Sequence, residues 1–178
     1  MPFHLHSETA SAAAPSIPVR SDVSPADTWD LTPLYANEED WEADLKILQT
    51  EYPKISEFLG RVGENTETLR AALEFEKAVG IRVEQLNQYA ALRVTEDSAN
   101  AEALAREARL ESLLLRVGEA FSFVGPEIQS LSDEKFALYL KDEALAEWII
   151  PLQKLRRQKP HTLSANEERL LALGSSAV

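Results

Sequence analysis

The feature that most restricts the fold is an apolar stripe with helical spacing in the second half of the chain. Its members follow the pattern i, i+4, i+7, i+11, i+14 and are Leu110, Leu114, Val117, Phe121 and Val124. This period places all five on one face of an α-helix, because a strand would require alternation at every second residue. Leu104 and Ala108 extend the stripe toward the N-terminus. We therefore expect a long amphipathic helix that ends at Gly125-Pro126.

Composition extends this prediction to most of the chain. Leu and Ala greatly outnumber Val and Ile among the 178 residues, and unbranched side chains lose little rotamer freedom in a helix. Apolar residues make up 44% of the chain, and a chain of this length can bury about two thirds of its unfolded surface. We predict an all-α fold of antiparallel helical hairpins that pack as a bundle.

Capping residues locate the remaining helices. Asn37 and Ser132 each precede acidic residues and a helical apolar pattern, which is typical of an N-cap, and the second helix is expected to start at Asn65 or Thr66. The predicted spans are 37–51 with a short continuation to 60, 65–95, 104–124, 132–140, 142–158 with a bend at Pro151, and a last helix that begins at Ser164.

The N-terminal part differs in composition. Ser, Ala and Pro dominate residues 1–26, and each proline biases the preceding residue away from helix. We expect a disordered tail over 1–26 and a helical domain over 27–178. Pro33 prevents a regular helix at the start of that domain, so we expect an extended segment held by Trp29, Leu31, Leu34 and Tyr35. We expect Trp29, Trp41 and Trp148 to be core or hairpin anchors.

Charge and composition exclude several classes of protein. The net charge is −12, which disfavours binding to nucleic acid and to anionic membrane surfaces. The chain has no Cys, so disulfides, Cys-ligated zinc, iron–sulfur clusters and thiol nucleophiles are excluded within it. No apolar stretch is long enough to cross a bilayer, and the first residues do not form a secretory signal. We expect a cytoplasmic protein.

Few residues are candidates for chemistry. His4 and His6 lie in the predicted tail, where an unfixed segment is a better explanation than a weak metal site. His161 is a lone loop histidine, which is usually structural. The chain contains no His-Glu-x-x-His pattern, no Gly-x-Ser-x-Gly pattern and no glycine-rich phosphate loop. From the residues alone we predict no catalytic, cofactor-binding or metal-ligating residue in this chain.

Two charged groups have alternative interpretations. The pair Glu107 and Glu111 has the spacing of a carboxylate dyad, but a solvated helix face explains it better. The basic cluster 152–159 could bind a carboxylate, although at the end of a predicted helix it would also complement the helix dipole. We favour the second interpretation.

Four strings along the chain resemble the oligoendopeptidase F family of zinc metallopeptidases, which is similar to thimet oligopeptidase. They occur in the family's order from residue 27 to residue 172: DTWDLTPLYANEEDWEADL at 27–45, NQYAALRVTEDSAN at 87–100, FSFVGPEIQSLSDEKFALYL at 121–140 and RRQKPHTLSANEERLLA at 156–172. The first carries the family's Trp-Asp-Leu-x-x-Leu-Tyr opening. The resemblance covers nearly all of the predicted domain.

This resemblance implies a longer parent enzyme. In the family, an N-terminal helical domain precedes a catalytic domain that carries His-Glu-x-x-His and a later Glu as zinc ligands, and the two enclose a substrate channel. None of these zinc-site positions is present here, so no catalytic residue carries over. The resemblance implies that this chain is the N-terminal domain alone. Its partners would be the catalytic domain and oligopeptide substrates, the parent's cofactor would be zinc, and the chain by itself would be inactive.

One alternative stays open at this point. An acidic helical interaction module without any catalytic partner would have the same composition. We also expect the last predicted helix to leave Leu170, Leu171 and Leu173 poorly covered by this chain, since little sequence follows them.

Overall fold

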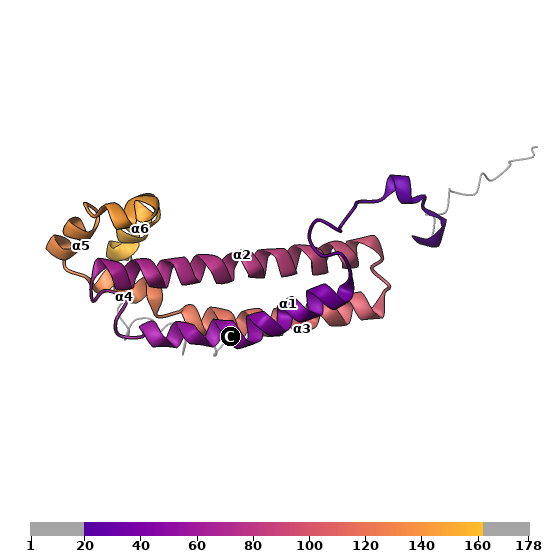
Figure 1. Ribbon diagram of the computed structural model, residues 1–178, viewed down its shortest axis with the longest axis horizontal. Helices are drawn as coiled ribbons and strands as arrows, with labels where there is room; N and C mark the ends of the chain where they lie inside the picture. Colours follow the sequence, from indigo (N-terminus) through magenta and orange to yellow (C-terminus); the bar gives the residue numbers. More distant parts are fainter. Residues whose placement is uncertain (1–19, 162–178) are drawn as a thin grey trace, which may run out of the picture.

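The computed structural model describes residues 20–161, and all regular structure in this range is helical. Three long helices form the body: α1 (Glu38–Glu51), α2 (Thr66–Glu96) and α3 (Ala101–Phe121). α2 and α3 run antiparallel as a hairpin, and α1 lies against it (Figure 1). The all-α prediction is confirmed.

Shorter elements complete the structure. α4 (Val124–Ser130), α5 (Asp133–Tyr139) and α6 (Ile149–Gln158) gather at the end of the hairpin where α2 begins (Figure 1). Within residues 20–161, five 3-10 helices precede, connect or follow the α-helices: η1 (Arg20–Asp22), η2 (Pro25–Asp27), η3 (Tyr52–Phe58), η4 (Glu143–Trp148) and η5 (Lys159–His161). The hairpin therefore has one end covered by small helices and one end, called the tip below, where α2 ends and α3 begins.

The predicted N-caps Asn37 and Ser132 are confirmed by their hydrogen bonds, and Asn65, one of the two expected starts of the second helix, caps it in the same way. The side-chain oxygen of Asn37 accepts from Asp40 N at 2.8 Å, and that of Asn65 accepts from Thr68 N at 2.8 Å. The Ser132 hydroxyl accepts from Lys135 N at 3.2 Å. Each cap satisfies a backbone N–H that the first helical turn leaves without a partner. α2 passes Gly80 as one continuous helix.

Two hydrophobic clusters fill the interior, one toward each end of the hairpin. The cluster at the α4–α6 end consists of Ile55, Val62, Leu69, Ala72, Leu73, Val124, Ile128, Leu131, Phe136, Tyr139, Leu145 and Leu152. The cluster toward the tip consists of Trp41, Leu45, Leu48, Val79, Leu86, Tyr89, Ala90, Leu110 and Leu113. Phe75 and Phe121 pack against both clusters, and their rings stack at 6.1 Å.

The predicted end of the third helix was wrong. α3 ends at Phe121, and Gly125-Pro126 lies in the first turn of α4, a helix that the sequence did not predict. Proline is compatible with a first turn because the N–H that it lacks has no helical acceptor there. The stripe is also displaced at its start, since Leu104 and Ala108 are exposed while Ala103 and Arg106 are buried. Arg106 is buried because Glu38 and Trp41 of α1 cover it.

The role predicted for Trp29 was also wrong. Its side chain is 78% exposed, whereas Leu31, Leu34 and Tyr35 pack against the tip cluster as expected. Trp41 is fully buried and donates its indole N–H to Leu86 O at 2.9 Å, which confirms its predicted place in the core. Trp148 is partly buried against the other cluster.

Several predicted segments have other outcomes. The span 142–158 is interrupted, as predicted, but at the junction of η4 and α6, two residues before Pro151. Residues 20–26 were assigned to the tail, but this part of the chain contains η1 and most of η2, and the division at residue 26 stays a prediction. The predicted helix from Ser164, with Leu170, Leu171 and Leu173, lies outside the described residues.

Gly63 gives a test of packing where η3 turns into α2. A Cβ at this position would lie 2.5 Å from Leu131 Cδ2 in the buried cluster. We expect Gly63→Ala to destabilise the fold by about 1–3 kcal/mol, because the packed Leu131 must move. The matched control is Gly118→Ala in α3, where no atom lies within 4 Å and a gain of up to about 1 kcal/mol is expected from helix propensity. Urea unfolding followed by circular dichroism measures both, and equal effects would contradict this packing.

Candidate functional site

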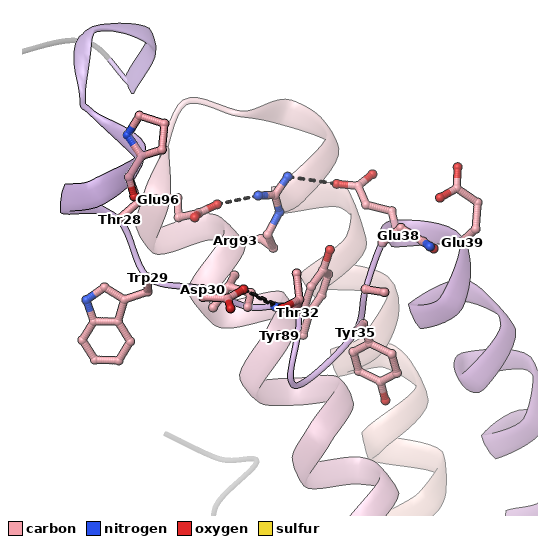
Figure 2. A pocket seen from close by; sticks show the side chains of 14 residues that line it. Thr28, Trp29, Asp30, Thr32, Tyr35, Glu38, Glu39, Tyr89, Arg93 and Glu96 are labelled. Carbon is pink, nitrogen blue, oxygen red and sulfur yellow. Dashed lines mark hydrogen bonds and ion pairs between the residues drawn. The ribbon is translucent and has the colours of Figure 1, made fainter.

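An open hollow of about 680 Å³ lies at the tip, beneath the leading segment, which is defined here as residues 23–37. The segment crosses the end of the hairpin and leads into α1, and side chains from α1 and α2 complete the lining (Figure 2). Aromatic and charged groups dominate this lining: Trp29, Tyr35, Tyr89, Asp30, Glu38, Glu39, Arg93 and Glu96. The hollow is therefore polar on one side and aromatic on the other.

The leading segment keeps its shape through local hydrogen bonds. Asp30 Oδ1 accepts from the backbone N–H of Thr32 at 2.9 Å and from its hydroxyl at 2.7 Å. Both bonds lower the pKa of the Asp30 carboxyl, and the bond from the Thr32 hydroxyl has the larger effect. Such a turn, in which a side chain replaces a backbone acceptor, is common for Asp in loops. It directs the chain back toward the body, where Leu31 and Leu34 pack.

Tyr35 fixes the segment to the hairpin. Its ring meets Tyr89 edge-on at 5.4 Å, and its hydroxyl donates to Asp44 Oδ2 at 2.7 Å. Arg82 donates to the other oxygen of Asp44 at 2.7 Å. Burial and then the bond to Asp44 raise the pKa of the Tyr35 hydroxyl above its usual value, since both disfavour the phenolate.

A chain of alternating charges joins four elements around the hollow. Arg20 of η1 pairs with Glu96 of α2 at 2.8 Å, and Glu96 pairs with Arg93 at 2.6 Å. Arg93 reaches Glu38 of α1 at 3.3 Å, and Glu38 pairs with Arg106 of α3 at 2.5 Å. Figure 2 shows the central part of this chain, in which Arg93 bridges Glu96 and Glu38.

Arg106 is the innermost member of this chain. Its side chain is 6% exposed, its guanidinium lies 5.7 Å from the centroid of the Trp41 ring, and its Nε has no hydrogen-bond partner. A buried cation is stabilised only when a counter-ion stays with it, because removal from water costs several kcal/mol. Glu38 therefore holds both α1 and the Arg106 charge in place.

The hollow can bind or pack but shows no catalytic arrangement. Its carboxylates are either paired with arginines or placed without a neighbouring acid or base. Across residues 20–161, no three or more His, Cys, Asp or Glu side chains lie close enough to hold a metal ion. In the same range no helix is long and apolar enough to cross a membrane. The arrangement suits a contact surface for another polypeptide.

Comparisons with known proteins agree with this fold. The family profile described as Oligopeptidase F matches residues 127–177. The chain is 28% identical to oligopeptidase PepF of Bacillus subtilis, over 92% of this chain and 25% of the relative. It is 30% identical to group B oligopeptidase PepB of Streptococcus agalactiae, over 89% of this chain and 26% of the relative.

Solved structures give the same result. The crystal structure of oligoendopeptidase-F from Enterococcus faecium superposes with a TM-score of 0.66 at 29% identity, over 76% of this chain and 27% of that chain. Over most of its length the chain is similar to members of the oligoendopeptidase F family. The crystal structure of a candidate peptidase from Chlamydophila abortus matches with a TM-score of 0.80 at 30% identity, over 91% of this chain and 28% of that chain. The chain spans about a quarter of the length of the curated relatives it matches.

Few of the residues that the sequence suggested as candidates for chemistry lie together in the structure. His4 and His6 lie outside the described residues, as does the side chain of His161. Glu111 is exposed and Glu107 is half-buried on α3, and neither takes part in the hollow. The expected absence of catalytic and metal residues stays a prediction for the whole chain.

The favoured interpretation of the basic cluster 152–159 agrees with the position of Arg156 and Arg157 in the last turn of α6, but it is incomplete for Arg156. Arg156, whose side chain is only 14% exposed, donates to Gln129 O at 2.9 Å and to Leu131 O at 2.8 Å and pairs with Asp133 at 2.6 Å. It therefore caps the C-terminal end of α4 rather than its own helix. The sequence could not show this, because the carbonyls that it satisfies are about 25 residues away.

Sequence reasoning also missed Glu127. Its carboxylate accepts from Gly60 N at 2.6 Å and from Val62 N at 3.2 Å, which ties α4 to the turn before α2. Gly60 adopts a positive φ of 75°, so the turn needs glycine there. The only signal available was the Gly-Arg-Val-Gly string at 60–63, which predicts a turn but not its acceptor.

Replacement of Glu38 tests the charge chain. We expect Glu38→Gln to destabilise the chain by about 2–3 kcal/mol, because it leaves the buried Arg106 without a counter-ion. Glu42→Gln is the matched control on α1, since it breaks the more exposed pair with Arg109, and its expected loss is below about 1 kcal/mol. The double variant Glu38→Gln/Arg106→Met should recover much of the loss. Equal losses of unfolding free energy for the two single variants in urea unfolding would show that the burial of Arg106 does not determine the cost of removing its carboxylate partner.

The raised pKa of Tyr35 predicts a dependence on alkaline pH. Because the folded state holds this proton more tightly than the unfolded state, Tyr35 contributes stability that is present below pH 10 and lost as the pH rises further. The stability of the unmodified chain should therefore fall relative to Tyr35→Phe above about pH 10. Urea unfolding of both proteins from pH 8 to 11.5 measures this difference, and curves that stay parallel would contradict it.

Proposed function

We propose that this chain is the N-terminal helical part of a zinc-dependent oligoendopeptidase that hydrolyses short peptides. The observation that carries the proposal is the pair of coverages: about nine tenths of this chain aligns with oligopeptidases of which it covers only a quarter. The remaining three quarters would then supply catalysis.

The zinc does not fit the described residues, since residues 20–161 hold no group of three potential ligands. Zinc ligands and the general base are therefore assigned to the part of the protein beyond this alignment. In such enzymes a zinc ion polarises the scissile carbonyl and lowers the pKa of its bound water. No step of the hydrolysis is assigned to a side chain of this chain.

We propose that the segment forms a wall of the substrate channel and limits access to it. The three-helix body suits this role because α2 is continuous over 31 residues, which corresponds to about 47 Å at 1.5 Å per residue. A rigid helical wall would admit extended peptides and exclude folded proteins. We expect the whole protein to act in the cytoplasm. This chain has no cysteine, so it forms no disulfide that would need an oxidising compartment.

An acidic interaction module is the alternative function. It is favoured by the two clusters, which this chain fills with its own side chains and which would let it fold without a catalytic partner. The experiment described next separates the two functions.

The test is a fusion in which this chain replaces the matching quarter of Bacillus subtilis PepF. We expect the fusion to cleave a quenched fluorescent peptide, and PepF without its first quarter and this chain alone to be inactive. A fusion as inactive as the truncated PepF would favour the interaction module. Hydrolysis by the isolated chain would refute the assignment of catalysis to the missing part.

A further inference from the structure

One apolar side chain in the family string is not explained by the fold of this chain. In Trp29-Asp-Leu-x-x-Leu-Tyr35, both leucines and the tyrosine pack against the tip cluster. Trp29 is 78% exposed, and Figure 2 shows its ring projecting away from the body. Exposure of an indole to water is unfavourable, so its presence here points to a contact outside these residues.

The backbone on both sides of Trp29 is fixed. Before it, Thr28 donates to Pro25 O through its N–H at 3.2 Å and through its hydroxyl at 2.8 Å. After it, the Asp30–Thr32 turn closes, and Arg20 ties the preceding η1 to Glu96. The indole is therefore presented from a pre-organised backbone, which reduces the entropy lost when a partner binds.

Trp29 stands beside an apolar groove. A second hollow of about 400 Å³ adjoins the first, and Leu31, Leu92 and Thr95 line it together with Trp29. Both leucines are half-buried, so their exposed sides form a floor next to the indole. Rigid tryptophans beside such grooves are the residues that dominate the energy of protein interfaces.

The charges around the groove restrict what can occupy it. Asp27, Asp30 and Glu39 border the two hollows, and no ion pair within residues 20–161 engages them. A partner that buries Trp29 must approach these carboxylates. Its contact surface therefore needs an apolar pocket with Arg or Lys at the rim, which could also stack on the indole.

We propose that Trp29, Leu31 and Leu92 form the docking surface for the remaining three quarters of the oligoendopeptidase, which receives the indole in an apolar pocket with a basic rim. This inference rests on the proposed function. The occupant is argued from the relatives, in which the counterpart of this chain is joined to a much longer remainder. If this chain is a quarter of a larger protein, its fixed and exposed indole is best explained by a contact with the other three quarters.

The test uses the fusion with PepF and single cysteines, which are unique reporters within this segment because the chain has none. Thr95→Cys lies at the groove, and Gln85→Cys, exposed on the same helix, is the matched control. Alkylation is followed by mass spectrometry of the peptide that carries each cysteine. We expect Thr95→Cys to react about tenfold or more slowly in the fusion than in the isolated chain, and Gln85→Cys to react equally in both.

Substitutions of the indole give an independent readout. We expect Trp29→Ala to leave the melting temperature of the isolated chain unchanged and to lower that of the fusion by about 4 °C or more. Asp27→Lys should lower it in the fusion alone. Gln85→Ala, at an exposed polar side chain on α2, should have no effect in either.

The outcomes separate this inference from the proposed function. An active fusion in which Thr95→Cys stays reactive and Trp29→Ala is neutral overturns the docking surface and leaves the proposed function standing. An inactive fusion overturns both. If light scattering shows the isolated chain as a dimer that Trp29→Ala dissociates, a second copy occupies the groove and the inference is wrong.

Discussion

Packing along α2 is the interaction on which the rest of the structure depends. Leu69, Ala72 and Leu73 in its first half belong to one hydrophobic cluster, and its second half contributes to the other. A polar helix of this kind is not stable by propensity alone, so its length reflects what packs against it. Gly80 sits near the middle, where it disfavours helix by about 1 kcal/mol, and the stacked rings of Phe75 and Phe121 bridge the two clusters close by.

The two ends of this helix are closed in different ways. At the α4–α6 end, hydrogen bonds from Arg156 and to Glu127 join short helices whose own backbone bonds are few. At the tip, the charge chain from Arg20 to Arg106 joins segments that apolar contacts alone would hold weakly. Arg106 loses most of its water in this pair whereas Glu38 keeps part of its own, so the net gain in stability is small, but the pair disfavours any register of α1 that separates the two charges.

Local signals in the sequence predicted local structure well. Asn37 and Ser132 were identified as caps because a cap involves only the next three residues. The all-helical class and the length of α2 followed from composition and period. The displaced stripe on α3 could not be predicted, since burial of Arg106 depends on a carboxylate 68 residues away that the periodicity of α3 does not include.

The hollow at the tip escaped prediction for the same reason. Trp29 was expected in the core because it follows the apolar pattern of its neighbours, yet the Asp30–Thr32 turn that directs Leu31 and Leu34 inward leaves Trp29 outside. An apolar residue in a short irregular segment has no periodicity that could assign it to a face. Only the three-dimensional path of the leading segment shows that Leu31 and Leu34 pack against the body while Trp29 is exposed.

The contacts of the leading segment with the long helices determine how firmly a partner bound to Trp29 would be held. The leading segment contacts α2 through the rings of Tyr35 and Tyr89, and α1 through the hydrogen bond from Tyr35 to Asp44. The charge chain at the tip continues to α3 through Glu38 and Arg106. A partner that binds the indole is then fixed relative to all three long helices and not to a loose loop. The proposed channel wall would need this property, because an enclosed channel keeps its width only when its wall cannot pivot at its attachment. We therefore expect the tip, more than the α4–α6 end, to set the position of the segment in the whole enzyme.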